Sequence, residues 1–208
     1  MVGALGMKTL LRDCFRRTYG LRVFYLRSRY ELPFVLNSMN LVGEGVELGV
    51  QLGHFSASIL SAWQGACLNS VDPWREFPQT EYEDASNVPQ VEQDRIFNEA
   101  NARLEAFGSR SRVLRMTSKE AAPLFREGQL DFVYIDAQHH YEAARDDIET
   151  WYPKVRKGGI LAGHDYLEGE REAGYFGVKR AVDEFVARRG LRLVISAEGD
   201  WPSWFVFC

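Results

Sequence analysis

Short apolar runs alternate with segments of helical pattern along most of this sequence. The apolar runs lie at residues 45–49, 67–72, 112–116, 131–136 and 159–164. The helical segments lie at residues 55–63, 91–107, 118–126, 141–151 and 177–189, and Ser118 is the expected N-cap of the third. This alternation is typical of βαβ units, and it predicts a parallel sheet that is covered by helices on both faces.

Two more apolar runs, at residues 191–196 and 204–208, end the sequence. The turn-like segment between them is too short for a helical crossover, so we expect these strands to form an antiparallel hairpin at the end of the sheet. The sequence therefore predicts an α/β fold that is Rossmann-like and doubly wound. Its seven-stranded sheet should be mostly parallel, with an antiparallel last strand.

The composition agrees with a single globular domain. Of the 208 residues, 46% are apolar and 26% are charged, which argues against disorder and low complexity. The three cysteines are far apart and form no CxxC pair, so we expect a reducing, cytoplasmic setting. We expect neither a signal peptide nor a membrane span, because no apolar run has the required length.

The charge is distributed unevenly along the chain. The first 40 residues carry seven basic and two acidic side chains, a net charge of +5, so the remaining residues carry −9. We expect residues 1–40 to form a basic helical arm and residues 41–208 to form the main domain. The arm could cap a substrate site or join two subunits of a homo-oligomer, and nucleic acid or anionic lipid is a less favoured partner.

A glycine turn follows the first predicted strand. Gly49 lets the chain turn sharply off the strand, and Gly53 lets a helix start close to a ligand. Gln51 stands where a GxGxxG motif has its middle glycine, so a dinucleotide loop is disfavoured. Asp72 ends the second strand, where a carboxylate can accept hydrogen bonds from ribose hydroxyls, and Trp74 could cover a flat base.

The longest irregular stretch, residues 73–89, follows the second strand. It contains three prolines and four acidic residues, namely Pro73, Pro78, Pro89, Glu76, Glu81, Glu83 and Asp84. Open α/β sheets bind ligands at the carboxyl ends of their strands, so this loop could be a lid over a ligand. A solvated insertion is the alternative.

Four later segments carry more specific motifs. They read DAQHHY from Asp136, DIETW from Asp147, GGILAGHDY from Gly158 and GVKRAVD from Gly177. Together with the glycine turn, they resemble class I S-adenosylmethionine-dependent methyltransferases. Within that class they are similar to the small bacterial branch of macrocin O-methyltransferase and cephalosporin-biosynthesis methyltransferases. The resemblance covers residues 42–208 and implies a seven-stranded sheet with an antiparallel last strand.

The resemblance also implies a cofactor site. The glycine turn and the helix after it would line the methionine end of S-adenosylmethionine, Asp72 would hold the ribose, and the end of the third strand would lie beside the adenine. The implied residues are Glu47, Gly49, Gln51, Gly53, Phe55, Asp72, Trp74, Met116, Thr117, Ser118 and Asp136.

The candidates for chemistry are Asp136, His139, His164 and Asp165. Asp136 ends the fourth strand, and His164 and Asp165 end the fifth, so these side chains should converge at one edge of the sheet. By resemblance, Asp136, His164 and Asp165 could hold a divalent metal such as Mg²⁺, although an oxygen ligand would suit Mg²⁺ better than His164. Without a metal, His139 or His164 could act as the general base.

The leading hypothesis is methyl transfer from S-adenosylmethionine to a hydroxyl group of a small molecule, such as a sugar or a natural product. An NAD-linked oxidoreductase and a catalytically silent cofactor-binding scaffold are the alternatives. The sequence does not identify the methyl acceptor. We expect its pocket to lie between the arm, the loop at residues 73–89 and residues 167–176.

Overall fold

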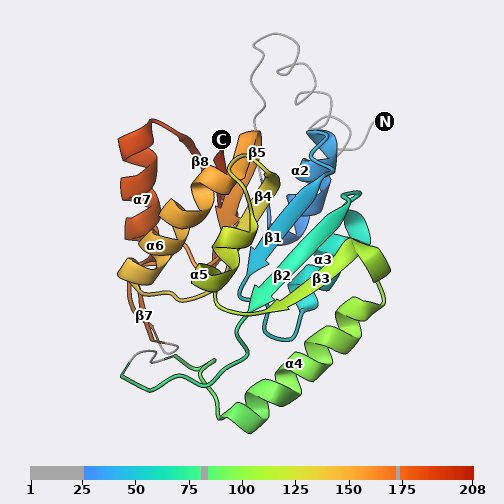
Figure 1. Cartoon of the computed structure of the whole chain (residues 1–208). Helices are drawn as coiled ribbons and strands as arrows, with labels where there is room; N and C mark the ends of the chain where they lie inside the picture. The colour runs from blue at the N-terminus through green and yellow to red at the C-terminus, as the bar shows by residue number, and fades with distance from the viewer. Residues whose placement is uncertain (1–25, 81–83, 172–173) are drawn as a thin grey trace, which may run out of the picture.

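The computed structural model describes residues 26–80, 84–171 and 174–208. Its centre is a seven-stranded sheet of strand order β3-β2-β1-β4-β5-β9-β8 (Figure 1). The strands are β1 (Glu44–Leu48), β2 (Cys67–Asp72), β3 (Ser111–Arg115), β4 (Leu130–Ile135), β5 (Val155–Gly163), β8 (Arg192–Ile195) and β9 (Trp204–Phe207). The pairs among β1 to β5 are parallel, and β9 is antiparallel to both β5 and β8. The predicted fold class is therefore confirmed.

Helices cover both faces of the sheet (Figure 1). They are α2 (Leu32–Ser38), α3 (His54–Ala62), α4 (Gln90–Glu105), α5 (Ser118–Ala121), α6 (Tyr141–Trp151) and α7 (Val178–Arg189). Four 3₁₀ turns accompany them, at Arg29–Glu31, Gly108–Arg110, Ala122–Leu124 and Tyr152–Lys154. None of the helices in the described part of the chain is long and apolar enough to cross a membrane.

The core has two halves because strand side chains alternate between the two faces. In β4, Val133 and Ile135 pack with α5, α6 and α7, whereas Phe132 and Tyr134 pack with α2, α3 and α4. All four side chains are buried. The continuous apolar runs of the sequence are thus strands that are buried on both sides.

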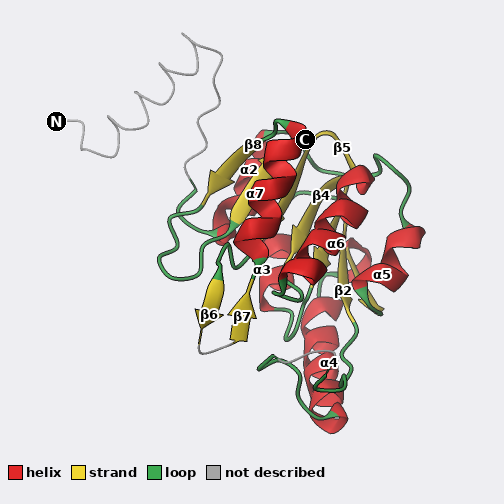
Figure 2. Ribbon diagram, turned by 90° about the vertical axis from the view of Figure 1, so that its left-hand side faces the viewer, coloured by secondary structure: helices red, strands yellow, loops and turns green. Residues whose placement is uncertain are grey.

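A small hairpin outside the main sheet was not predicted. Its strands, β6 (Gly169–Arg171) and β7 (Gly174–Phe176), pair antiparallel with each other (Figure 2). Three residues per strand are too few to show an alternating pattern, so no sequence signal marked them. The hairpin lies within residues 167–176, which we expected to help form the acceptor pocket.

Helix α5 differs from the helix predicted at residues 118–126 at both ends. Thr117, not Ser118, is the N-cap: its side chain accepts from the backbone N–H of Glu120, whose carboxylate accepts from the backbone of Thr117. The α-helix ends at Ala121 and continues as a 3₁₀ turn, because Pro123 has no N–H to donate to the helix. The predicted helix at residues 118–126 was therefore too long.

The segment before β1 belongs partly to the core. Residues 1–25 of the predicted arm lie outside the described residues. In the described remainder, Leu26, Leu32 and Leu36 are buried and pack in the same half of the core as α3.

Two of the sequence motifs have clear packing roles. In the motif from Asp147, the carboxylate of Asp147 accepts from Ser118 Oγ, and Trp151 Nε1 donates to the same hydroxyl at 2.8 Å. At Gly177, an added Cβ would lie 2.7 Å from both Cβ and N of Tyr141. These motifs hold α5 against α6 and the start of α7 against the start of α6.

Gly49 should be irreplaceable in the fold. Its φ is +80°, and an added Cβ would lie 1.8 Å from the carbonyl oxygen of Asp136. We expect Gly49→Ala to lower the free energy of unfolding by several kcal/mol, because both strain and overlap oppose it, as measured by urea denaturation. Gly190→Ala is the matched control: its φ is +62° with open space around it, so only the strain of roughly 1–2 kcal/mol applies. Equal losses of unfolding free energy in the two variants would contradict the role of the close contact between Gly49 and the carbonyl of Asp136.

Candidate active site

The carboxyl ends of β1, β4 and β5 meet at one point. Ile135 pairs with Gly163 in parallel register, and the backbone N–H of His164 donates to the carbonyl of Ile135 at 3.0 Å. The N–H of Asp136 donates to the carbonyl of Leu48 at 2.8 Å. The register therefore brings Asp136 and His164 together beside the glycine turn, as the sequence predicts.

Backbone strain gathers at the same edge. Among the described residues, four non-glycine residues have positive φ: Asn40, Gln51, Trp74 and Asp165. Three of them, Gln51, Trp74 and Asp165, lie just beyond the carboxyl ends of β1, β2 and β5. Strained backbone of this kind concentrates at functional sites because the surrounding packing must hold it in place.

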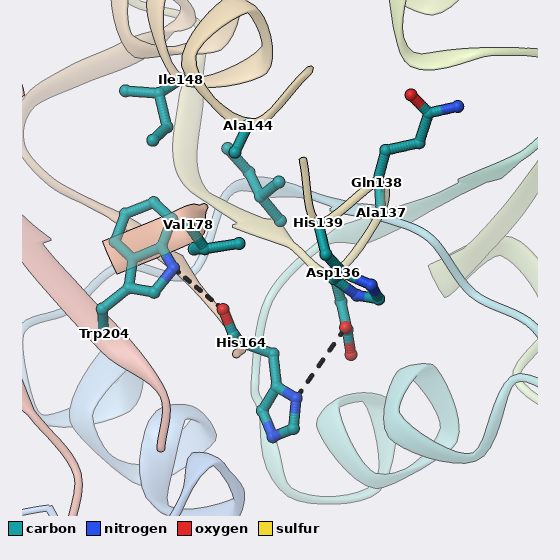
Figure 3. Close-up of a pocket in the computed structure, with 10 residues that line it drawn as sticks. Asp136, Ala137, Gln138, His139, Ala144, Ile148, His164, Val178 and Trp204 are labelled. Carbon is teal, nitrogen blue, oxygen red and sulfur yellow. Dashed lines mark hydrogen bonds and ion pairs between the residues drawn. The ribbon is translucent and has the colours of Figure 1, made fainter. Parts of the chain in front are cut away.

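Asp136 lies between two basic side chains. Arg29 Nη1 donates to Asp136 Oδ2 at 2.8 Å. On its other side, His164 Nδ1 is 3.9 Å from Asp136 Oδ1, and Figure 3 shows the two side chains facing each other. Burial raises the pKa of Asp136, although the neighbouring basic groups His164 and Arg29 act in the opposite direction. The carboxylate predicted at the end of the fourth strand is thus half-buried and paired.

The chain of ionisable groups continues through Asp165. Asp165 Oδ1 is 2.8 Å from His164 Nδ1, and Asp165 Oδ2 is 2.9 Å from His139 Nε2. Burial acts to raise the pKa of Asp165, but contacts with His139 and His164 outweigh it and hold the pKa well below its usual range. Asp165 therefore stays ionised and links the two histidines.

His139 has a carboxylate on each ring nitrogen. Its Nδ1 is 3.1 Å from Asp84 Oδ2, and its Nε2 faces Asp165. Burial acts to lower the pKa of His139, but hydrogen bonds and charge from Asp165 and Asp84 raise it to about 10. The ring also stacks on Phe176, with centroids 4.8 Å apart. His139 is thus a fixed cation in this arrangement.

A small cavity lies beside this network. Asp136, Gln138, His139 and His164 line its polar side, and Ile135, Ala137, Ala144, Ile148, Val178 and Trp204 complete the wall (Figure 3). Trp204 Nε1 donates to the carbonyl of His164 at 3.2 Å. Trp204 thereby fixes the backbone that carries His164 and Asp165.

Asp72 holds the glycine turn. Asp72 Oδ2 accepts from the backbone N–H groups of Val50 at 2.9 Å and Gln51 at 3.0 Å, and its Oδ1 accepts from Trp74 N at 2.8 Å. Trp74 is buried, and its Nε1 donates to the carbonyl of Gln51 at 2.9 Å. A ribose bound at Asp72 would share the carboxylate oxygens of Asp72 with the backbone of the turn. An adenine base could contact the indole ring of Trp74 only if that buried ring became exposed.

The remaining predicted cofactor residues lie along the same edge. The N–H of Met116 donates to the carbonyl of Asp72 at 3.1 Å, which places the end of β3 beside the end of β2. Phe55 is buried between Tyr30 and Tyr134, with ring centroids 5.7 and 4.6 Å away. The hydroxyl of Ser118 is already bonded within the helix layer, as described above.

Glu47 lies in the interior, below the turn. It is 1% exposed, and its carboxylate accepts from Ser56 Oγ, which is 2.9 Å from Ser70 Oγ. Burial raises the pKa of Glu47 to about 8, although the Ser56 hydrogen bond acts in the opposite direction. Glu47 is therefore largely protonated at neutral pH and forms part of the floor under the turn.

The carboxylates do not fit a magnesium ion as they are arranged. Ligand atoms of Asp136, His139 and Asp165 lie within 4.8 Å of one another, whereas the sequence had suggested His164 in place of His139. However, Arg29 and His139 already pair with these oxygens. An imidazole that faces carboxylates on both nitrogens must donate from both, so His139 has no lone pair for a metal. Mg²⁺ requires several free oxygen ligands.

Sequence reasoning missed two members of the network, Arg29 and Asp84. Arg29 precedes Asp136 by 107 residues, and Asp84 precedes His139 by 55. The only available signals were the basic charge of the arm and the acidic residues of the long loop. Neither signal points to a partner, because both segments lack periodicity that would fix their place.

Comparison with known families identifies the class of protein to which this fold belongs. The family described as "Methyltransferase domain" matches residues 46–166, more than half of the chain. The chain therefore belongs to this family, and it is an S-adenosylmethionine-dependent methyltransferase. The family assignment supports a methyltransferase and gives no support to the NAD-linked oxidoreductase alternative. No protein with a curated function matches the sequence.

Solved structures show the same fold at low sequence identity. A "putative caffeoyl-CoA O-methyltransferase" from Staphylococcus aureus aligns with a TM-score of 0.62 and 13% identity, covering 96% of this chain and 91% of its own. An O-methyltransferase family protein from Burkholderia thailandensis aligns with a TM-score of 0.60 and 14% identity. The alignment covers 98% of this chain and 60% of that protein's chain. A methyltransferase from Geobacter sulfurreducens aligns with a TM-score of 0.56 and 15% identity. The alignment covers 96% of this chain and 86% of that protein's chain.

The buried acid Glu47 should make stability depend on pH. Between its ordinary pKa of 4.5 and the raised value of about 8, the folded state keeps a proton that the unfolded state has released, so the free energy of unfolding falls as pH rises. We expect Glu47→Gln to reduce this fall between pH 5 and pH 8, measured by urea denaturation without cofactor. Glu127→Gln, at an exposed site, should keep the wild-type slope. An unchanged slope in Glu47→Gln would contradict the assignment.

Proposed function

We propose that this methyltransferase transfers the methyl group of S-adenosylmethionine to a hydroxyl oxygen of a small molecule. The observation that carries the proposal is the pairing of His164 with Asp165 at the end of β5, next to Asp136 and the glycine turn. Such a pair can remove the proton of a hydroxyl group, which is the chemical requirement that distinguishes an oxygen acceptor. The O-methyltransferase names of two structural neighbours are consistent with this acceptor class.

His164 is the better base of the two histidines. His139 is bonded through both nitrogens to carboxylates, so it has no nitrogen free to accept a proton. His164 contacts Asp165 through Nδ1, and Nε2 has no hydrogen-bond partner within the described ranges. A carboxylate at Nδ1 fixes the tautomer in which Nε2 accepts a proton, as in other histidine bases.

The cofactor would lie along the edge from Asp72 to Asp136. In this proposal the glycine turn from Gly49 to Gly53 and the side chain of Phe55 line the methionine end, Asp72 holds the ribose, and Met116 with Thr117 lies beside the adenine. The N-terminus of α3, which begins at His54 directly after this turn, would face the carboxylate of the methionine part.

The acceptor would enter between segments that reach over this edge. Arg29 comes from the segment before β1, Asp84 from the loop at residues 73–89 and Phe176 from β7, and all three contact the network. We therefore favour the arm at residues 1–40 as a cap and the loop as a lid. A sugar or a natural product is the acceptor class that the resemblance of the sequence motifs suggests.

Replacement of His164 should stop the transfer but not the binding of the cofactor. We expect His164→Gln to lower the rate of methyl transfer about 100-fold or more, the usual range for loss of a general base. The measurement is S-adenosylhomocysteine formation with a panel of hydroxylated sugars and phenols. His140→Gln is the control, because His140 stacks on Tyr175 outside the network, and it should stay near the wild-type rate. Equal rates in wild type and His164→Gln would remove His164 from the mechanism.

Asp72 should set the affinity for the cofactor. We expect Asp72→Asn to weaken S-adenosylhomocysteine binding by roughly tenfold or more, because an amide cannot accept as many hydrogen bonds as a carboxylate. Isothermal titration calorimetry measures this, with the exposed Asp146→Asn variant as the control. NAD should give no heat of binding. Unchanged affinity in Asp72→Asn would show that the ribose is held elsewhere.

A further inference from the structure

We infer that the methyl transfer proposed above needs no divalent metal, because Arg29 and His139 already pair with the carboxylate oxygens of Asp136 and Asp165 that a metal ion would need. The inference rests on the proposed function and identifies the residues that supply positive charge at the site. It is carried by the contacts of the two cations and by the charge balance of the site.

His139 is held as a cation by its geometry. Asp165 Oδ2 lies 2.9 Å from Nε2, and Asp84 Oδ2 lies 3.1 Å from Nδ1. Both oxygens belong to carboxylates, which can only accept, so each ring nitrogen carries a proton. The ring is stacked on the buried Phe176 at an interplanar angle of 23°, and this packing prevents it from turning away. The singly charged imidazolium of His139 is thus held beside Asp165.

Arg29 is the second built-in cation. Its guanidinium donates to Asp136 Oδ2 at 2.8 Å. The guanidinium carbon also lies 4.8 Å from the ring centroid of Phe55 and 5.6 Å from that of Tyr30. Buried Leu26 and Leu32 anchor the segment that carries it. Arg29 cannot lose its charge under physiological conditions. Any metal ion at Asp136 would have to displace this guanidinium from its aromatic contacts.

The charges of the site are nearly balanced by the protein itself. Asp84, Asp136 and Asp165 contribute three negative charges, and Arg29 and His139 contribute two positive charges. One negative charge remains, which matches the single positive charge of the sulfonium of S-adenosylmethionine. A divalent ion would leave an excess of positive charge in a largely buried site, and such an excess is costly.

The reaction step balances without a further reactant. The acceptor O–H gives its proton to Nε2 of His164, the oxygen forms a bond to the methyl carbon, and the carbon–sulfur bond breaks with its electron pair going to sulfur. The sulfonium becomes the neutral thioether of S-adenosylhomocysteine, while neutral His164 becomes a cation beside Asp165. The net charge of the site is therefore unchanged, and His164 later releases its proton to water.

Binding of Mn²⁺ to the full-length protein tests the inference without knowledge of the acceptor. The free ion is followed by electron paramagnetic resonance in titrations of wild type, Arg29→Met and His139→Leu. We expect wild type to bind no Mn²⁺ at this site. Each variant should bind the ion with an affinity at least roughly tenfold above the detection limit that the wild-type titration sets, because removing a cation leaves a carboxylate uncompensated. Arg27→Met, at an exposed neighbouring arginine, should behave as wild type.

Three results would overturn the inference. The first is one Mn²⁺ site in wild type that Asp136→Asn weakens, and the second is the absence of tighter binding in both variants. The third applies even if the variants do not fold: loss of wild-type methyl transfer in EDTA, restored by Mg²⁺ or Mn²⁺. Failure of the proposed function is seen separately, as no S-adenosylhomocysteine binding by calorimetry or no transfer to any hydroxyl acceptor.

Discussion

The parallel pairing of β4 with β5 is the constraint on which the site depends. Ile135 pairs with Gly163, so the residues that follow, Asp136 and His164, leave the sheet at the same level. Gly163 permits this pairing because an added Cβ would lie 2.5 Å from the carbonyl oxygen of Ile135 and 2.6 Å from the Trp204 ring. A shift of one residue in this register would turn every side chain of β5 to the other face of the sheet and separate Asp136 from His164.

Charge compensation is the second organising principle of the edge. Ionised groups in a poorly hydrated place are stable only when each is paired. Here the pairs form a continuous chain from Arg29 through Asp136, His164, Asp165 and His139 to Asp84. The ends of this chain lie on the segment before β1 and on the loop at residues 73–89. Ion pairs therefore connect both segments to this edge of the sheet.

Local patterns predicted the sheet well. Each apolar run is a strand because its neighbours bury both faces, and each helical segment shows its own periodicity, so both can be recognised without knowledge of distant residues. The predictions failed at two places: where two neighbouring residues could both cap a helix, and where strands are too short to show a pattern. Thr117 and Ser118 are both capable N-caps, and only the Glu120 contact selects Thr117. The three-residue strands β6 and β7 have no period to detect.

The sequence by itself determined the fold class, the glycine turn and the acids and histidines that end β4 and β5, since strand ends in a parallel sheet share one edge. Only the tertiary structure decided which groups pair there. It placed Arg29 on Asp136 and Asp84 on His139. His139 is therefore bonded through both ring nitrogens, whereas Nε2 of His164 has no hydrogen-bond partner among the described residues. The physical reason is that ion pairs across 107 and 55 residues depend on how irregular segments pack, and no local pattern encodes that packing.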